Sequence, residues 1–217
     1  TNFGLGITIL KHNYDETDFK AALQIAFEHD NTVLIEKFIP GREFRIFIIN
    51  DEVVGILHRV PANVTGDGVL NIGQLIDRKN EDPLRGKGYR TPLEKIRKGR
   101  EEEMFLKQQG MDFNTVPKEG EVVYLRENSN ISTGGDSIDF TDDIDDSYKA
   151  IAVEAAKALN VKITGLDMMI QDIHAPATPD NYAIIEMNFN PAIHIHCYPF
   201  KGKNRHLNHK MIRALGF

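Results

Sequence analysis

Two apolar segments in the carboxyl-terminal third of the chain are each interrupted by polar residues. Residues 163–171 read ITGLDMMIQ and hold Asp167, and residues 182–188 read YAIIEMN and hold Glu186 and Asn188. Short apolar runs of this length favour buried strands, and side chains two positions apart on a strand share a face. Because an unpaired buried charge is costly, these polar residues are expected to have partners. The two segments therefore constrain the chain to a sheet that carries acidic side chains.

If these two strands are neighbours, their polar side chains form one cluster. Glu186 and Asn188 then share a face, and Asp167 joins them from the adjacent strand. Two carboxylates and an amide oxygen are hard ligands that suit Mg²⁺, which prefers a few carboxylates together with substrate phosphates. The alternative is that the carboxylates lie at strand ends and face solvent.

The rest of the chain alternates the patterns of helices and strands. Apolar spacing predicts helices over 15–29, 145–159 and 205–215. Further strands are expected over 7–10, 33–39, 43–50, 52–60 and 121–126, with Asn50 and Asp51 as a tight hairpin turn. Residues 61 to about 120 differ in composition, with the glycine-containing GDG, the basic DPLRGKGYR and the charged REEEMFLKQQG. They indicate an insertion with modest helices over 71–78 and 92–109. The predicted fold class is α/β with mixed sheets.

Composition narrows the class of protein. The chain has 217 residues, 26 basic and 32 acidic side chains, a formal net charge of −6 and 41% apolar residues, a globular balance. There is no long basic run for nucleic acid, no run of roughly 20 apolar residues for a membrane helix and no signal-peptide pattern. The single cysteine, Cys197, excludes an internal disulfide and indicates the cytoplasm. Because the chain opens at Thr1 in a glycine turn, an upstream part is expected.

Two further motifs combine turns with charged residues. In IEKFIPGREFRIF, a strand stops at a Pro-Gly turn and restarts with Glu43 and Arg45 on one face, which also fits a salt-bridged strand pair. In YLRENSNISTGGDS, Arg126 and Asn128 precede Gly134 and Gly135. Backbone amides in such a loop form anion nests, and an arginine forks onto phosphate or carboxylate. A plain surface loop is the alternative.

Taken together and in this order, the motifs resemble the ATP-grasp superfamily. Within it, the loop STGGDSID and the ending NPAIHIHCYPFKGKNRHLNHK are similar to the carboxyl-terminal glutathione synthetase module of bifunctional glutamate–cysteine ligase/glutathione synthetases. The resemblance covers essentially the whole chain. It implies an ATP-grasp fold of two lobes with mixed or antiparallel sheets, lacking its upstream part. Residues 1–40 would be part of the small lobe, and 41–217 the large lobe with an insertion at about 66–120.

The resemblance also implies roles for individual residues. Gly4 and Gly6 would end the glycine-rich loop over the triphosphate. The adenine would contact Glu36, Lys37 and Ile39, and the ribose Glu43. Arg45, Arg126 and Asn128 would face the transferred phosphate and the acyl group. Substrate carboxylate would bind at Ser132, Thr133, Gly134 and Gly135, and Mg²⁺, or Mn²⁺ in its place, at Asp167, Glu186 and Asn188.

The activity implied is an ATP- and Mg²⁺-dependent ligation. ATP would convert the carboxylate of γ-glutamylcysteine to an acyl phosphate, which glycine attacks to give glutathione. An upstream glutamate–cysteine ligase domain in the same chain and a homodimer are the implied partners, without nucleic acid or membrane. A cyanophycin-type or other amino-acid ligase, and a catalytically inactive nucleotide-binding fragment, are the alternatives.

The carboxyl-terminal segment allows other interpretations. His194 and His196 would share a strand face beside Cys197, so a transition-metal site with His206 and His209 is one alternative. In the family interpretation this segment lines the substrate pocket, and Cys197 is structural rather than a nucleophile. Basic residues that could contact substrate carboxylates are Lys87, Arg90, Lys201, Lys203 and Arg205.

Overall fold

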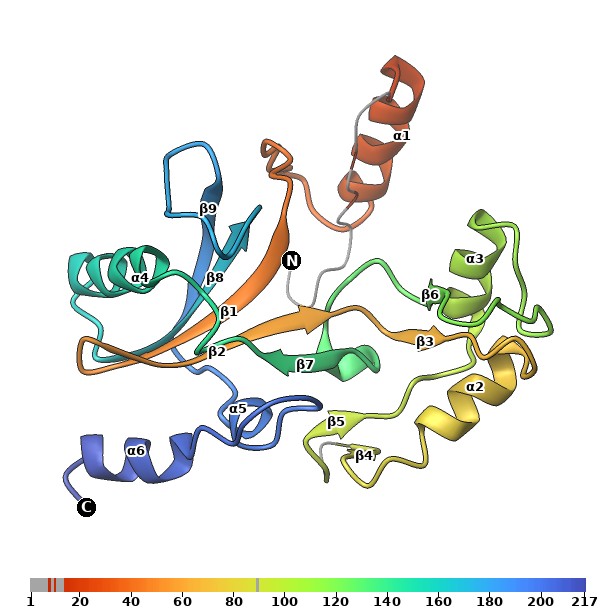
Figure 1. The fold of residues 1–217 in the computed structure, drawn as a ribbon. Coiled ribbons are helices and arrows are strands. Elements are labelled where there is room, and N and C mark those ends of the chain that lie inside the picture. Colours follow the sequence, from red (N-terminus) through yellow and green to blue (C-terminus); the bar gives the residue numbers. More distant parts are fainter. Residues whose placement is uncertain (1–7, 9, 11–13, 89) are drawn as a thin grey trace. The chain divides into compact units, whose positions relative to one another are not determined.

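The computed structural model describes residues 8, 10, 14–88 and 90–217. The chain divides into two compact units, Thr1–Pro40 and Gly41–Phe217, called here the amino-terminal unit and the large unit. Figure 1 shows their elements in chain order.

The amino-terminal unit contains one described helix, α1 (Glu16–Phe27). The side chain of Asp15 caps it by accepting hydrogen bonds from the backbone N–H groups of Thr17 (2.7 Å) and Asp18 (2.9 Å). This pairing satisfies donors that a helix start leaves without partners. The strand expected over 33–39 is wrong, because these residues adopt neither helix nor strand. A strand exists only through pairing, and an apolar run does not reveal whether a partner is present. The strand expected over 7–10 lies largely outside the described residues.

A five-stranded sheet forms the centre of the large unit, in the order β7-β2-β1-β8-β9. Its strands are β1 (Arg42–Ile49), β2 (Glu52–Val60), β7 (Asp136–Asp139), β8 (Ile163–Ile170) and β9 (Tyr182–Asn188). All neighbouring pairs are antiparallel. The expected neighbours β8 and β9 are paired, and β1 lies against the other edge of β8.

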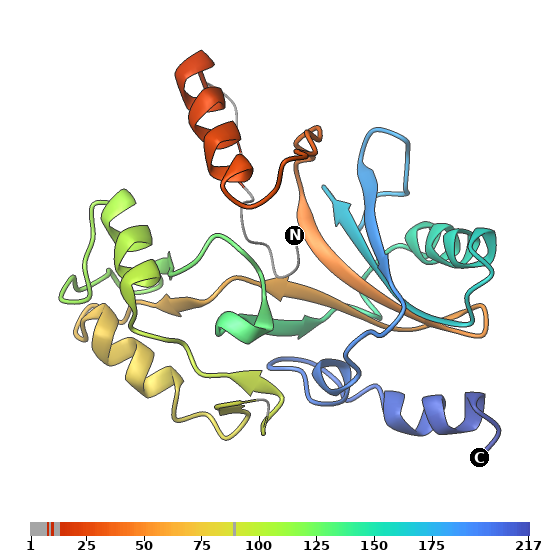
Figure 2. The ribbon, with the colours of Figure 1, turned by 180° about the vertical axis from the view of Figure 1, so that it is seen from behind.

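Helices cover the two faces of this sheet, as Figures 1 and 2 show from opposite sides. On β1, Phe44, Ile46 and Ile48 face the core beneath α4 (Asp146–Ala158). Phe47 and Ile49 face the opposite way, toward α6 (Leu207–Ala214) and the short helix α5 (His194–Cys197). This alternation follows from the two-residue period of a strand and explains why β1 is an almost continuous apolar run.

The segment 62–125, which includes the insertion expected at about 66–120 and is called the insertion below, has a hydrophobic core of its own. It contains β3 (Asn63–Thr65), α2 (Ile72–Lys79), β4 (Arg85–Gly86), β5 (Leu93–Glu94), α3 (Arg100–Gln108) and β6 (Val122–Tyr124), followed by the 3₁₀ turn η2 (Ile131–Thr133). Strands β3 and β6 pair antiparallel, and β4 and β5 pair parallel. The helix expected over 92–109 begins only at Arg100, because residues 93–94 pair as a strand and Gly99 is the N-cap.

The α/β fold class is therefore confirmed, with an antiparallel central sheet; among the described strands, parallel pairing is limited to the separate pair β4–β5. In the part of the chain that the structure describes, no helix has the length and apolar character that crossing a bilayer requires.

Candidate functional site

Asp167 lies on β8, where two arginines from β1 and β2 bind its carboxylate. Arg45 sits opposite it in the β1–β8 register and donates two hydrogen bonds to its carboxylate, one of them from Nη2 at 2.8 Å. Arg59 on β2 donates to the same carboxylate at 3.1 Å. Asp167 is only 3% exposed and Arg45 8%. Burial by itself raises the pKa of Asp167, but the two guanidinium groups outweigh it and hold that pKa below its ordinary value.

A cavity of about 170 Å³ opens beside these arginines. It joins residues from separate parts of the chain: β1, β2, β5, the loop at η2, and the segment entering α5. Its lining is Arg45, Arg59, Pro92, Glu94, Asn130, Ile131, Ser132, Ala192, His194 and Ile195. The structure thus brings the predicted Arg45 and Ser132 together in one cavity with two cationic groups.

The glycines of the STGG loop are required by its backbone. Gly134 ends η2 with a φ of 96°, in the left-handed region that glycine favours. A Cβ atom there would lie 2.7 Å from the Cα of Ile96. A Cβ on Gly135 would lie 2.8 Å from the carbonyl oxygen of Val60. Both glycines are therefore needed for close backbone approach, whatever else they contact.

The three predicted metal ligands lie together on adjacent strands. Asp167 is directly opposite Glu186 in the β8–β9 register. Glu186 is exposed, and its Oε1 accepts a hydrogen bond from Nδ2 of Asn188 at 3.0 Å. Two carboxylates and an amide make a donor set that fits Mg²⁺. Glu186 is exposed and Asn188 half-buried, whereas both oxygens of buried Asp167 already accept hydrogen bonds from arginine, so a metal at Asp167 would have to share those oxygens with the guanidinium groups or displace one.

Glu43 forms an ion pair with Arg59 and accepts a hydrogen bond from Ser129 Oγ at 2.8 Å. Glu43 therefore lies close to the cavity, because its partner Arg59 is one of the lining residues. Arg126 instead forms ion pairs with Glu101 and Glu102 at the start of α3, the latter at 2.6 Å.

The remaining predicted residues of this region are peripheral to the cavity. Asn128 is exposed and accepts a hydrogen bond from Thr133 Oγ1 at 3.0 Å. Neither Arg126 nor Asn128 is among the residues that line the cavity. In the amino-terminal unit, Glu36 and Lys37 are exposed and Ile39 is half-buried. Gly4 and Gly6 lie outside the described residues.

The histidine segment differs from its expected strand. His194 and His196 lie in α5, so they point in different directions rather than sharing a strand face. His196 is fully buried with its ring 5.4 Å from that of Phe47, centroid to centroid. Among the described residues, no group of three His, Cys, Asp or Glu side chains could hold a metal ion. The transition-metal interpretation therefore has no support, whereas His194 does line the cavity.

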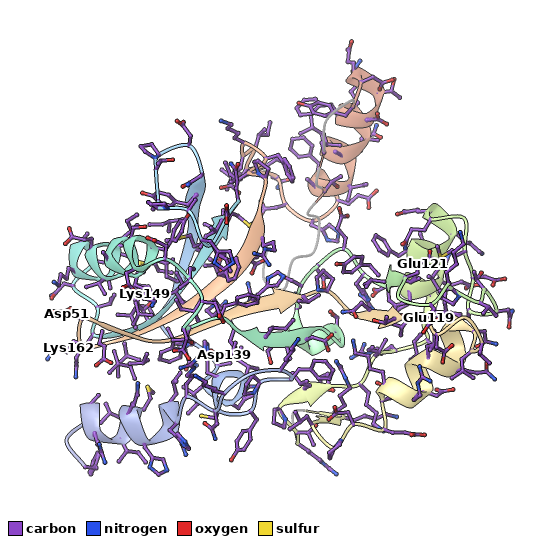
Figure 3. All side chains as sticks on the ribbon, viewed as in Figure 1. Asp51, Glu119, Glu121, Asp139, Lys149 and Lys162 are labelled. Carbon is purple, nitrogen blue, oxygen red and sulfur yellow. The ribbon has the colours of Figure 1, made fainter. Side chains whose placement is uncertain are left out.

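Two of the basic residues considered as substrate contacts are paired within the protein. Arg205 binds both Asp139 and Asp142, and Lys203 binds Asp142 at 2.6 Å. Figure 3 places Asp139 at strand β7. These carboxylates anchor the carboxyl-terminal segment to the sheet. Lys201 joins β7 through its backbone, and Lys87 lines a separate cavity of about 680 Å³ in the insertion.

Arg59 is the site residue that the sequence analysis missed. A signal for it existed: Arg59 interrupts the apolar strand β2, as Arg45 interrupts β1. In the antiparallel register it lies across from the Glu43 region, where it reaches both Glu43 and Asp167.

The whole chain is similar to known proteins. No protein-family model matches it. The glutathione biosynthesis bifunctional protein GshAB of Desulfotalea psychrophila is 63% identical over 217 residues, covering 100% of this chain and 28% of that protein. The protein of the same name from Clostridium perfringens is 58% identical over 215 residues, covering 99% of this chain and 28% of that protein. The chain thus spans little more than a quarter of the length of these curated relatives.

A solved structure shares the fold. The crystal structure of a bifunctional glutathione synthetase from Pasteurella multocida matches with a TM-score of 0.78 and 46% sequence identity. The match covers 99% of this chain and 30% of that one.

Proposed function

This chain belongs to the family of bifunctional glutathione biosynthesis proteins, and from that premise we propose that its large unit holds the substrate site of an ATP-dependent carboxylate–amine ligase that makes glutathione. One observation carries the proposal. Arg45 and Arg59 converge on a cavity that the STGG loop also lines, beside the Asp167–Glu186–Asn188 cluster. Such an arrangement offers cations for an anionic substrate next to oxygen ligands for a divalent metal.

The reaction we propose has two steps. An oxygen of the glycine-accepting carboxylate of γ-glutamylcysteine attacks the terminal phosphorus of ATP, which forms an acyl phosphate and releases ADP. The amino nitrogen of glycine then attacks the acyl carbon, the carbon–oxygen bond to phosphate breaks, and the amine gives up a proton to solvent. Neither step needs a covalent enzyme nucleophile. This agrees with Cys197, which is buried and does not line the cavity.

Arg45 and Arg59 provide positive charge in the cavity, where the transferring phosphoryl group would carry negative charge. Arg45 and Arg59 are held by Asp167 through hydrogen bonds of 2.8 and 3.1 Å, so their guanidinium groups are oriented before substrate arrives. Such preorganised groups stabilise transferring phosphoryl groups at little reorganisation cost. Ser132, which also lines the cavity, offers a hydroxyl donor to a carboxylate or phosphate oxygen.

Glu186, Asn188 and Asp167 are the residues we propose to hold Mg²⁺, with Mn²⁺ as a substitute. The metal supplies charge neutralisation to the ATP phosphates when it is bound. The nucleotide itself is proposed to contact Glu36, Lys37 and Ile39 through the adenine. Glu43 is proposed to bind the ribose, and for this it must leave Ser129 or Arg59. Gly4 and Gly6 stay proposed as triphosphate contacts, and Arg126 and Asn128 as contacts of the transferred group.

The test is an activity assay on the full-length protein that carries this chain. We expect ADP release that requires Mg²⁺, γ-glutamylcysteine and glycine together, with glutathione identified by mass spectrometry. Turnover with arginine or aspartate acceptors instead would favour a cyanophycin-type or other amino-acid ligase. ATP binding without turnover by any of these would favour an inactive nucleotide-binding protein. The upstream glutamate–cysteine ligase activity and a homodimer are tested on the same sample, by glutamate- and cysteine-dependent ADP release and by light scattering.

A further inference from the structure

The buried side chain of Arg85 connects two walls of the 170 Å³ cavity that Arg45 and Arg59 line. Its side chain has no exposed surface. Its Nη1 donates to the backbone carbonyl of Glu94 at 2.8 Å and to that of Gly134 at 3.0 Å. Its Nη2 forms an ion pair with Asp136. Glu94 lies in β5 and lines the cavity, and Gly134 directly follows the lining loop at η2.

Lys79 is a second cation that pairs with the buried carboxylate of Asp136, but its other hydrogen bonds go to Asn63 rather than to the cavity walls. Lys79 Nζ donates to Asp136 at 2.6 Å and to the carbonyl of Asn63 at 2.9 Å. The ring of Phe200 covers both cations, at 5.2 Å from Lys79 and 5.5 Å from Arg85. Lys79 has no hydrogen bond to Glu94 or Gly134 among those of the described residues. Substitutions of the two residues therefore distinguish an effect on the stability of this cluster from an effect on the position of the cavity walls.

We propose that Arg85 is a positioning residue that sets the spacing between β5 and the STGG loop, and thereby the affinity of the cavity for the substrate carboxylate. The proposal rests on the proposed function. A guanidinium is a rigid planar fork that can bind a carboxylate and two carbonyls at once. A lysine ammonium at the same place keeps the charge for Asp136 but cannot hold both carbonyls in this geometry.

The matched variants are Arg85→Lys and Lys79→Met. In the full-length protein, we expect Arg85→Lys to raise the KM for γ-glutamylcysteine about tenfold, since misplacing substrate contacts is costly. The kcat and the KM for ATP should stay within about twofold. Lys79→Met should lower the thermal midpoint and leave all three kinetic constants near their wild-type values. An unchanged KM in Arg85→Lys, or an equal KM increase in Lys79→Met, overturns the proposal.

Hydrogen–deuterium exchange gives a readout that does not depend on turnover. Arg85→Lys and Arg85→Gln should exchange faster than wild type in peptides covering 130–135, and Lys79→Met should not. Arg85→Gln keeps an N–H donor without the charge, so it serves where Arg85→Lys does not fold. If the wild type lacks activity with γ-glutamylcysteine and glycine, the proposed function fails, and the exchange data still decide whether Arg85 positions the loop. Unchanged exchange in both Arg85 variants overturns the positioning role.

Discussion

The charges around Asp167 do not balance within the cluster. Arg45 and Arg59 supply two positive charges, against the carboxylates of Glu43, Asp167 and Glu186. Like charges directly opposite on paired strands repel, and Asp167 faces Glu186 in this way. The unbalanced charge lies on exposed Glu186, where a cation can reach it. This residue-level imbalance is the physical basis for proposing that Mg²⁺ binds there rather than among the histidines.

Replacing Glu186 with glutamine should therefore weaken the metal site without harming the fold. We expect Mg²⁺-dependent turnover of the full-length protein to fall by about 100-fold, the size of losing one electrostatic contact at a reaction centre. The thermal midpoint should not fall, because the Glu186 side chain is exposed and the substitution removes a negative charge that faces Asp167. The comparison variant is Glu119→Gln, an exposed carboxylate in the insertion (Figure 3). Full turnover at an unchanged Mg²⁺ requirement in Glu186→Gln would rule out the assignment.

His196 should make the stability of the chain sensitive to acid. It is fully buried, neither ring nitrogen has a hydrogen-bond partner among the described residues, and burial lowers its pKa from 6.5 to about 3. Between those values the unfolded chain binds the proton and the folded chain does not. The free energy of unfolding should thus fall as pH falls from about 7 to about 5, by about 2 kcal/mol from this residue.

Urea unfolding of the 217-residue chain at the two pH values measures this effect. His196→Met should lose the contribution of His196 to the pH dependence, and the exposed His174→Gln should keep it. Burial and Arg42 also lower the pKa of His58, to about 4, so His58 adds a similar slope in every variant. Identical pH dependence in wild type and His196→Met would contradict the prediction.

At the scale of elements, the β1–β2 hairpin offers a test of turn chemistry. Asn50 and Asp51 both have positive φ, 47° and 65°. The backbone N–H of Asn50 donates to the backbone carbonyl oxygen of Lys162 at 2.8 Å. Figure 3 shows Asp51 and Lys162 at the same end of the sheet. Turns with two positive φ angles favour glycine at the second position. Asp51→Gly should raise the free energy of unfolding by about 0.5 kcal/mol, because relief of backbone strain exceeds the entropy cost of glycine. Asp51→Ala is the control and should lower it in the same urea titration.

Elements with strong local signals could be predicted from the sequence, and those that depend on tertiary pairing could not. The hairpin, α4 and strands β8 and β9 have clear periodicity or turn residues, and each was found within one or two residues of its expected bounds. The expected strand over 33–39 and the extended segment at His194 were wrong. Short apolar runs carry no signal that separates a paired strand from a coil or a single helical turn.

The candidate site could be predicted only in part, for the same reason. Asp167, Glu186 and Asn188 stand out because polar residues interrupt apolar strands, and the structure places them together. Arg59 interrupts β2 in the same way, but the partner that it binds, like the partner of Arg85, is defined only by contacts with residues far along the chain, at Asp167 and Gly134. No local pattern encodes such contacts, since they follow from sheet order and from the packing of the insertion.

At the scale of the whole molecule, the cavity depends on the complete folding of the large unit. Its lining comes from two sheet strands, the insertion, η2 and the segment entering α5. The insertion and the two faces of the sheet have separate hydrophobic cores. Loss of any one core therefore removes part of the cavity lining, and substrate affinity should report on the integrity of all three.

The amino-terminal unit ends in a segment that provides the last test. Residues 28–40 form neither helix nor strand, and Lys37 within them is exposed, so trypsin should cut the chain there early. If adenine binds the backbone of Lys37 and Ile39 as proposed, ATP with Mg²⁺ should slow that cleavage. At a nucleotide concentration about ten times the Kd, the rate should fall about tenfold, because only the unbound fraction is cut. Cleavage at Lys118, an exposed loop residue of the insertion, should continue at its original rate. Equal protection of both sites would show a general effect on the fold, and protection of neither would remove the adenine assignment from this segment.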